Sequence, residues 1–132
     1  FIEVAVRLSG GDFSETMIPL SSSFNLIKNS INLALQNKIK KKDLKIKFKK
    51  IYIAHRYFFS KKGQLVNIYG LNKIKKKSWV KKIKIFKNKG DFLSQTTNHT
   101  NRLGVFVITA GSQKQIDQRI QEVYKKIKFK II

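Results

Sequence analysis

Cysteine is absent from the 132-residue sequence, and proline occurs only once. The lack of thiols excludes disulfides and thiolate metal sites, and it fits the reducing cytoplasm. No uninterrupted apolar stretch reaches the length of a membrane span, and the N-terminus shows no signal peptide. We therefore expect a cytoplasmic protein without a membrane partner.

Acidic residues are also scarce. The sequence contains seven acidic and 29 basic residues, which gives a formal net charge of +22. Such a charge is typical of nucleic-acid-binding modules, whose cations displace the counterions of phosphates. However, lysine outnumbers arginine 25 to 4, and Lys, Ile, Asn and Phe make up 62 of the 132 residues, a bias that AT-rich codons produce. A nucleic-acid reader is expected to use more arginine, whose planar fork grips phosphates and guanine edges.

The pattern of the lysines favours a structural explanation of the charge. "LKIKFKK" (44–50) and "KKIKIFK" (81–87) alternate apolar residues with lysine, as half-buried strands with one wet face do. We interpret the charge as solvated strand faces, without a specific nucleic-acid partner. The alternative function is a lysine-rich basic module that binds nucleic acid or another anionic surface non-specifically.

The remaining composition, 42% apolar and 11% aromatic, is enough for the core of one domain. The pattern predicts an α+β fold with a largely antiparallel sheet and two main helices. The first part is expected to hold a strand at 1–8, an extended segment at 14–20 turned by Pro19, and a helix at 21–38. That helix has serines as candidate N-caps and a buried stripe of Phe24, Ile27, Ile31 and Ala34 or Leu35.

The second part is expected to contain most of the strands and the longer helix. A hairpin turn is predicted at "SKKG" (60–63), with Gly63 as its left-handed residue. The last helix, up to about Ile127, begins with Ser112 and Gln115 at capping-box spacing and buries Ile116, Ile120, Val123 and Ile127. The other expected elements are strands near 45–49, 51–59, 64–69, 79–87 and 102–110, an edge strand at 128–132, a turn at 87–91 and a loop at 94–101.

The opening stretch "FIEVAVRLSGGDF" (1–13) contains the candidate site. In a strand, Glu3, Ala5 and Arg7 share one face, so a carboxylate and a guanidinium line the same side. Gly10 and Gly11 follow, and paired glycines allow a ligand to approach the backbone closely. From the residues alone, a ligand site and a simple ion pair between Glu3 and Arg7 are both open.

Other chemistry-bearing residues give weaker signals. His55 and His99 lie 44 residues apart without companion carboxylates, so we expect no metal site there. Trp79 could stack on bases, as could the aromatic residues of a predicted strand, Tyr57, Phe58 and Phe59. Their spacing favours positions in the core.

Residues 1–35, "FIEVAVRLSGGDFSETMIPLSSSFNLIKNSINLAL", resemble the end of the ATP-grasp core of carboxylate ligases, where an E-x-N-x-R strand leads through small residues to an amphipathic helix. "YFFSKKGQLVNIYG", "KNKGDFL" and "NRLGVFVITAGSQKQIDQRIQEVYKKI" resemble the C-terminal closing portion of the same enzymes. The resemblance covers essentially the whole chain in order. It is closest to the branch that contains L-amino acid ligases and carbamoyl-phosphate-synthase-like proteins.

The resemblance implies an enzyme that uses ATP and Mg²⁺ to form an acyl-phosphate and joins it to an amine or similar nucleophile. Glu3 matches the glutamate that holds Mg²⁺ against the ATP phosphates, and Arg7 matches the catalytic arginine that faces the acyl-phosphate or the substrate carboxylate. Gly10 and Gly11 match the loop beside the substrate. Ala5 departs from the pattern, because the family commonly has an asparagine there as a second metal ligand.

The resemblance also implies a division of the chain. Residues 1–42 correspond to the end of the catalytic core, and residues 43–132 to the closing β-hairpin and helix portion. The chain starts without methionine and directly in a strand, so we expect the N-terminal domains and the nucleotide lid to precede it as partners. The 132-residue fragment alone is expected to be inactive, and its oligomeric state stays open, with a homodimer as one option.

Overall fold

The computed structural model describes residues 7–132 and contains two compact units, Phe1–Lys50 and Ile51–Ile132. Glu3, Ala5 and the strand expected at 1–8 fall wholly or mostly outside the described residues. The domain boundary expected after residue 42 concerns parts of an enzyme and stays a prediction.

The described elements of the N-terminal unit are the π-helix η1 (Phe13–Met17), α1 (Ile18–Ser22), α2 (Leu26–Ala34) and the 3-10 helix η2 (Lys41–Leu44).

The segment expected to be extended around Pro19 is helical instead. η1 runs directly into α1, with Pro19 in the first turn of α1. Proline is tolerated there because its missing N–H would have no partner in the helix anyway. The single proline therefore helps to start a helix and does not turn an extended segment.

The helix expected at 21–38 is shorter than predicted. Ser23 adopts a left-handed conformation with φ 57° and ends α1, and its N–H donates to the Pro19 carbonyl. α2 starts three residues later, at Leu26, and its N-cap is Asn25, whose side chain accepts from the Lys28 N–H at 2.9 Å. The predicted serine caps are therefore wrong.

The predicted buried stripe on this helix is wrong in its second half, whereas Phe24 and Ile27 are half-buried. Ile31 and Ala34 are exposed, and the Leu35 side chain is 66% exposed. Asn29 is the buried residue of α2, and its Nδ2 donates to the Asp43 carbonyl at 3.0 Å.

The lysine-rich segment 44–50 is not the half-buried strand that its alternation predicts. Its apolar residues are exposed, with Phe48 at 85%. The Lys47 and Lys49 N–H groups donate to the Ser22 and Ser21 carbonyls, at 2.9 and 2.7 Å. These bonds hold the segment beside the end of α1, but they do not supply an apolar surface that could bury one face.

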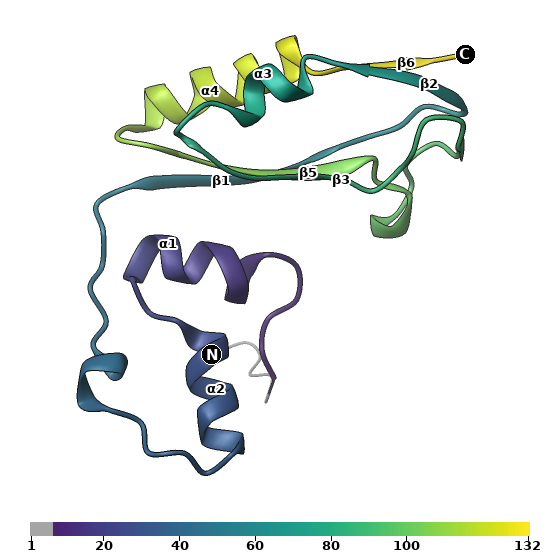
Figure 1. The fold of residues 1–132 in the computed structure, drawn as a ribbon. Coiled ribbons are helices and arrows are strands. Elements are labelled where there is room, and N and C mark those ends of the chain that lie inside the picture. Colours follow the sequence, from purple (N-terminus) through teal and green to yellow (C-terminus); the bar gives the residue numbers. More distant parts are fainter. Residues whose placement is uncertain (1–6) are drawn as a thin grey trace. The chain divides into compact units, whose positions relative to one another are not determined.

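The C-terminal unit confirms the predicted α+β class. Figure 1 shows two helices, α3 (Leu71–Lys75) and α4 (Gln113–Lys126), on one face of a sheet. No helix in the described part of the chain, 7–132, is both long and apolar enough to cross a membrane. The strands are β1 (Tyr52–Phe58), β2 (Gly63–Tyr69), β3 (Val80–Ile85), β4 (Phe92–Leu93), β5 (Gly104–Ala110) and β6 (Lys128–Ile131), with the 3-10 helix η3 (His99–Asn101) in the predicted loop.

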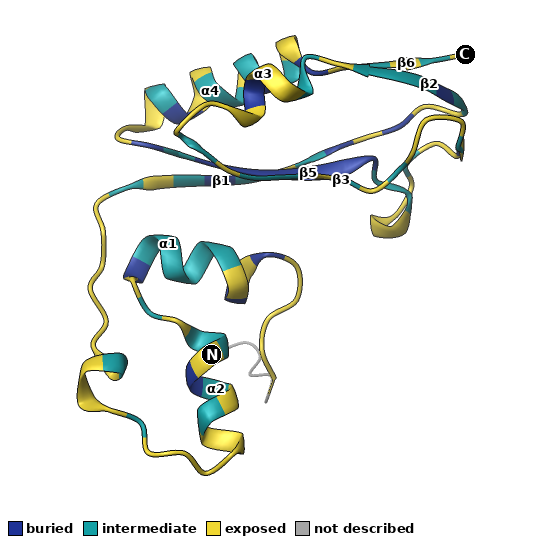
Figure 2. Ribbon diagram, viewed as in Figure 1, coloured by how far each residue is buried: buried dark blue, intermediate teal, exposed yellow. Residues whose placement is uncertain are grey.

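The strands form two antiparallel sheets of three. One has the order β1-β5-β3 and the other the order β4-β2-β6. β5 lies in the middle of the first sheet and is buried along most of its length (Figure 2). The edge strand expected at the C-terminal end is confirmed as β6, which pairs with β2.

The hairpin predicted at 60–63 does not form, because β1 and β2 belong to different sheets. Ser60 is buried and fastens the end of β1 to the 94–101 loop: its N–H donates to Thr96 Oγ1 at 2.8 Å, and its Oγ donates to the Ser94 carbonyl at 2.6 Å. Gly63 has φ 145° and lies within β2. The turn residues at 60–63 therefore do not determine the partner of β1, which pairs with the buried strand β5 instead.

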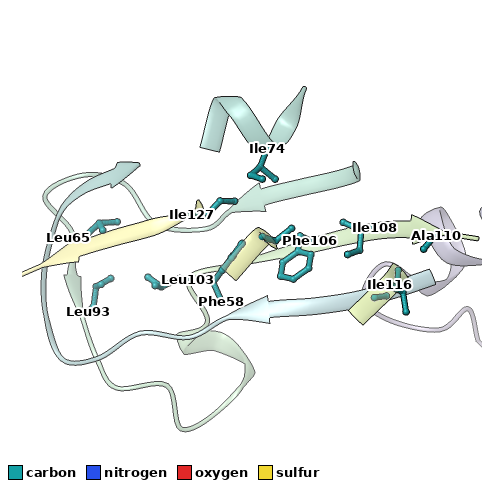
Figure 3. Packing of buried hydrophobic residues seen from close by; sticks show 12 residues of the cluster. Phe58, Leu65, Ile74, Leu93, Leu103, Phe106, Ile108, Ala110, Ile116 and Ile127 are labelled. Carbon is teal, nitrogen blue, oxygen red and sulfur yellow. The ribbon is translucent and has the colours of Figure 1, made fainter. Parts of the chain in front are cut away.

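The core of this unit lies between the β1-β5-β3 sheet and α4 (Figure 3). Phe58 and Phe106 pack with ring centroids 5.1 Å apart, and Tyr124 packs edge-on against both. The predicted stripe of α4 is confirmed, with Ile116, Val123 and Ile127 buried and Ile120 half-buried.

The predicted cap of α4 is confirmed as well. Ser112 Oγ accepts from the Gln115 N–H at 3.3 Å. The Gln115 side chain accepts from the Gly111 N–H at 2.8 Å, one residue earlier than a capping box requires. The cap therefore satisfies N–H groups on both sides of the helix start.

Candidate functional site

The described part of the candidate site is the loop that enters η1. Ser9 and Ser14 close this loop, with their hydroxyl oxygens 2.8 Å apart. The buried Ser14 hydroxyl also lies 3.2 Å from the Ser9 carbonyl, to which it can donate. The Asp12 carbonyl accepts from the Thr16 and Met17 N–H groups, both at 3.0 Å, so the following helix starts at the end of the loop.

Gly10 and Gly11 form the exposed tip of this loop. Gly11 has φ 65°, a left-handed conformation that glycine adopts at little cost. An added Cβ at Gly10 would meet no heavy atom within 4 Å. The backbone at the tip is therefore open to approach by another group.

Arg7 lies at the start of the same loop and is exposed. Its guanidinium donates to the neighbouring Leu8 carbonyl at 3.3 Å, a long bond that uses one of its five donors. A permanently charged, planar donor set of this kind is suited to bind a carboxylate or a phosphate. Arg7, Gly10 and Gly11 are thus all exposed within one short stretch of the chain, whereas Glu3 falls outside the described residues, and its role stays a prediction.

The two histidines lie in different surroundings. His55 is half-buried in β1 and packs against Tyr57 with ring centroids 4.8 Å apart. His99 is exposed in η3. Among residues 7–132, no group of three His, Cys, Asp or Glu side chains could hold a metal ion.

The aromatic candidates divide into three environments. Phe58 is in the core, as predicted, whereas Phe59 is 64% exposed, so its predicted core position is wrong. Residues 58 and 59 point to opposite faces of an extended chain, which explains the difference. Tyr57 and Trp79 are half-buried, and each ring packs against an arginine. Arg102 Cζ lies 3.8 Å from the centroid of the Tyr57 ring, and Arg119 Cζ lies 5.2 Å from that of the Trp79 ring. Neither arginine–aromatic pair could be predicted from the sequence, because the residues of each pair lie about forty residues apart along the chain.

Two solved enzymes share the fold of this chain. The L-amino acid ligase from Bacillus licheniformis superposes with a TM-score of 0.81 over 99% of this chain, at 17% sequence identity. The phosphoribosylglycinamide synthetase from Anaerococcus prevotii superposes with a TM-score of 0.76 over 92% of this chain, at 14% identity. This chain spans 32% and 30% of those two proteins, about a third of their length.

The family follows from the sequence of the C-terminal unit. Residues 56–131 match the family model described as L-amino acid ligase C-terminal domain 2, and the chain belongs to this family. The resemblance to the C-terminal part of ATP-grasp carboxylate ligases is thereby confirmed. No curated protein sequence matches the chain significantly.

Proposed function

We propose that this chain is the C-terminal part of an ATP-dependent ligase that activates a carboxylate as an acyl-phosphate and joins it to an amine or a similar nucleophile. The observation that carries the proposal is the family match over residues 56–131. In the sequence, these residues follow a segment that contains the exposed residues Arg7, Gly10 and Gly11. The missing parts of the site would come from the rest of the enzyme. The carboxylate and the nucleophile are small-molecule partners.

Arg7 has the chemistry that this reaction needs. Negative charge builds up on oxygen atoms while a phosphoryl group is transferred to a carboxylate, and a fixed cation stabilises that charge. The guanidinium is exposed, and its described hydrogen bond is a long one to a neighbouring carbonyl. A ligand oxygen can therefore replace that bond at small cost.

The glycine tip would complete one wall of the substrate site. Because Gly10 carries no Cβ and faces open space, a substrate can lie directly against the backbone. The Ser9–Ser14 contacts hold both ends of the loop, which limits the ordering cost on binding.

ATP and Mg²⁺ are the cofactors that the family implies. The described residues fit the anionic partner, since Arg7 supplies donors for a phosphate or carboxylate, but residues 7–132 contain no cluster of carboxylates for a metal. A hard cation prefers carboxylate oxygens, so Glu3 has the right chemistry for Mg²⁺. In this proposal Glu3 holds the metal, which supplies charge neutralisation for the ATP phosphates.

The role of Glu3 is tested by Glu3→Gln in the intact enzyme. A metal ligand is needed for turnover, whereas a surface ion pair contributes only about 0–1 kcal/mol to folding. We expect nearly unchanged thermal stability and a loss of ATP turnover of about 100-fold or more. The fragment alone should show no ATPase activity. Near-normal turnover together with a melting temperature several degrees lower would instead support the ion pair with Arg7.

Arg7 is tested by Arg7→Lys, which keeps the charge and removes the planar donor fork. We expect turnover to fall by about 100-fold, the scale of losing one transition-state donor. Arg56→Lys is a matched control, because Arg56 is also exposed and donates to a neighbouring carbonyl, that of His55, at 3.1 Å. Equal effects of the two substitutions on turnover would rule out a special role for Arg7.

A further inference from the structure

The C-terminal unit contains a groove between α3 and α4 with a volume of about 690 Å³. This volume lies within the range of small-molecule sites, roughly 300–1,000 Å³. The two helices run beside each other over the same face of the sheet (Figure 1), so the groove is formed by regular elements. Such walls are more rigid than loops.

The floor of the groove is apolar. Ile68 of β2 and Leu71 and Ile74 of α3 line it. Ile74 is 1% exposed and belongs to the core cluster, while Ile68 and Leu71 are half-buried and pack against that cluster. An apolar body placed here would rest on side chains that are already fixed.

The charged part of the lining is mostly basic. Lys73, Lys77 and Lys126 line the groove with a single carboxylate, that of Glu122. Lys77 Nζ lies 3.5 Å from Glu122 Oε1, and the two side chains are 49% and 36% exposed. This contact joins the residues just after α3 to α4. An exposed pair at this distance is weak, so an incoming anion can take the place of Glu122 beside Lys77.

We propose that this groove binds a small amphipathic anion, with a carboxylate or phosphate head and an aliphatic or aromatic body. The body lies on Ile68, Leu71 and Ile74, and the head lies among the three lysines. Lysine recognises either head as a point charge, so the groove selects by sign of charge and by the presence of an apolar body.

The proposal makes opposite predictions for the two members of one ion pair. Glu122 competes with the ligand head for Lys77, so Glu122→Gln should tighten binding. Lys77→Gln removes an attractive charge and should weaken it. Lys77 is exposed and Glu122 is half-buried, so solvent screens both charges in part, and we expect changes in Kd of about threefold in each direction.

The test uses the full 132-residue chain and matched eight-carbon probes. Octanoate and octyl phosphate carry the two candidate heads, octanol lacks the charge, octylammonium reverses it, and acetate lacks the body. Amide chemical shifts in ¹H–¹⁵N NMR spectra locate each probe and give its Kd. We expect octanoate or octyl phosphate to shift the amides of residues 70–77 and of Glu122 and Lys126. Octanol and acetate should bind at least about tenfold more weakly, and octylammonium should not bind there.

Lys114→Gln and Asp117→Asn are the control variants. Both residues are exposed on α4 and lie outside the lining of this groove. They change the net charge by the same amount as Lys77→Gln and Glu122→Gln, and they should leave the Kd unchanged. Equal effects of control and groove variants would overturn the proposal, as would shifts spread over the whole surface. Octanol binding as tightly as octanoate would also overturn it.

Discussion

Gly70 connects β2 to α3, and its replacement tests how closely the start of α3 approaches the end of α4. Its φ is 76°, in the left-handed region. An added Cβ would collide with the carbonyl oxygen of Lys126, the last residue of α4, and would come within 2.9 Å of the carbonyl carbon. Both atoms belong to the backbone, so relief requires α3 and α4 to move apart.

The expected cost of Gly70→Ala has two parts. The left-handed conformation costs a residue with a Cβ about 1–2 kcal/mol. The forced shift of packed backbone adds about 1–3 kcal/mol. We therefore expect a loss of about 2–5 kcal/mol in the free energy of unfolding. Gly90→Ala is the matched control, because Gly90 has φ 97° but open space around an added Cβ. It should cost only the first part, about 1–2 kcal/mol.

The assay is urea unfolding followed by tryptophan fluorescence. Trp79 is the single tryptophan and lies in the C-terminal unit, so its signal reports on that unit. The midpoint should fall clearly further for Gly70→Ala than for Gly90→Ala, with similar m-values. If the two substitutions destabilise the unit equally, the close approach of Gly70 to the end of α4 is wrong.

Two further predictions concern Tyr124 and the basic surface. Burial raises the pKa of the Tyr124 phenol, although the Arg56 cation acts in the opposite direction. The folded state therefore keeps this proton to higher pH than the unfolded state, so its contribution to stability is constant below about pH 10 and declines as the pH rises further. Tyr124→Phe loses the 2.9 Å hydrogen bond to the Tyr57 carbonyl and should cost about 0.5–1.5 kcal/mol at neutral pH, with a smaller difference from wild type above pH 10 in urea titrations. For the basic surface, we expect weak DNA binding without sequence preference that falls steeply with salt in fluorescence anisotropy. A Kd below about 10⁻⁸ M at physiological salt, with clear discrimination between sequences, would contradict this.

The sequence predicted the elements whose signals are local. The helix after Ser112 combines a cap with an apolar stripe of helical period, and both are present in α4. The strand predicted at 102–110 contains the apolar run Val105–Ile108 and becomes the central strand β5. In each case the residues that form the element also carry the information that specifies it.

Errors arose where the outcome depends on distant residues. The pairing of β1 with β5 joins segments about fifty residues apart, and a turn at 60–63 gives no information about it. α3 was missed because it has five residues, two of them lysines, and starts at a glycine without a side-chain cap. Ile46 and Phe48 are exposed, although their alternation with lysine predicted a half-buried strand, because alternation alone does not specify what packs against a strand.

The candidate site was predicted from resemblance more than from physics. Arg7, Gly10 and Gly11 are three residues among many polar ones, and only the family pattern distinguishes them. The structure adds that Gly10 and Gly11 lie in a loop closed by Ser9 and Ser14, and that Arg7 is exposed just before it. The groove between α3 and α4 could not be predicted, because Leu71 and Glu122 are brought together only by the folding of the C-terminal unit.

The most direct test of the proposed ligase function is to trap the activated carboxylate. The intact enzyme is given ATP, Mg²⁺ and a panel of carboxylates, with hydroxylamine in place of the amine. Hydroxylamine attacks an acyl-phosphate and releases phosphate, so we expect equal amounts of hydroxamate, ADP and phosphate, formed only when a suitable carboxylate is present. Formation of AMP and pyrophosphate, or ADP release that no carboxylate stimulates, would contradict it.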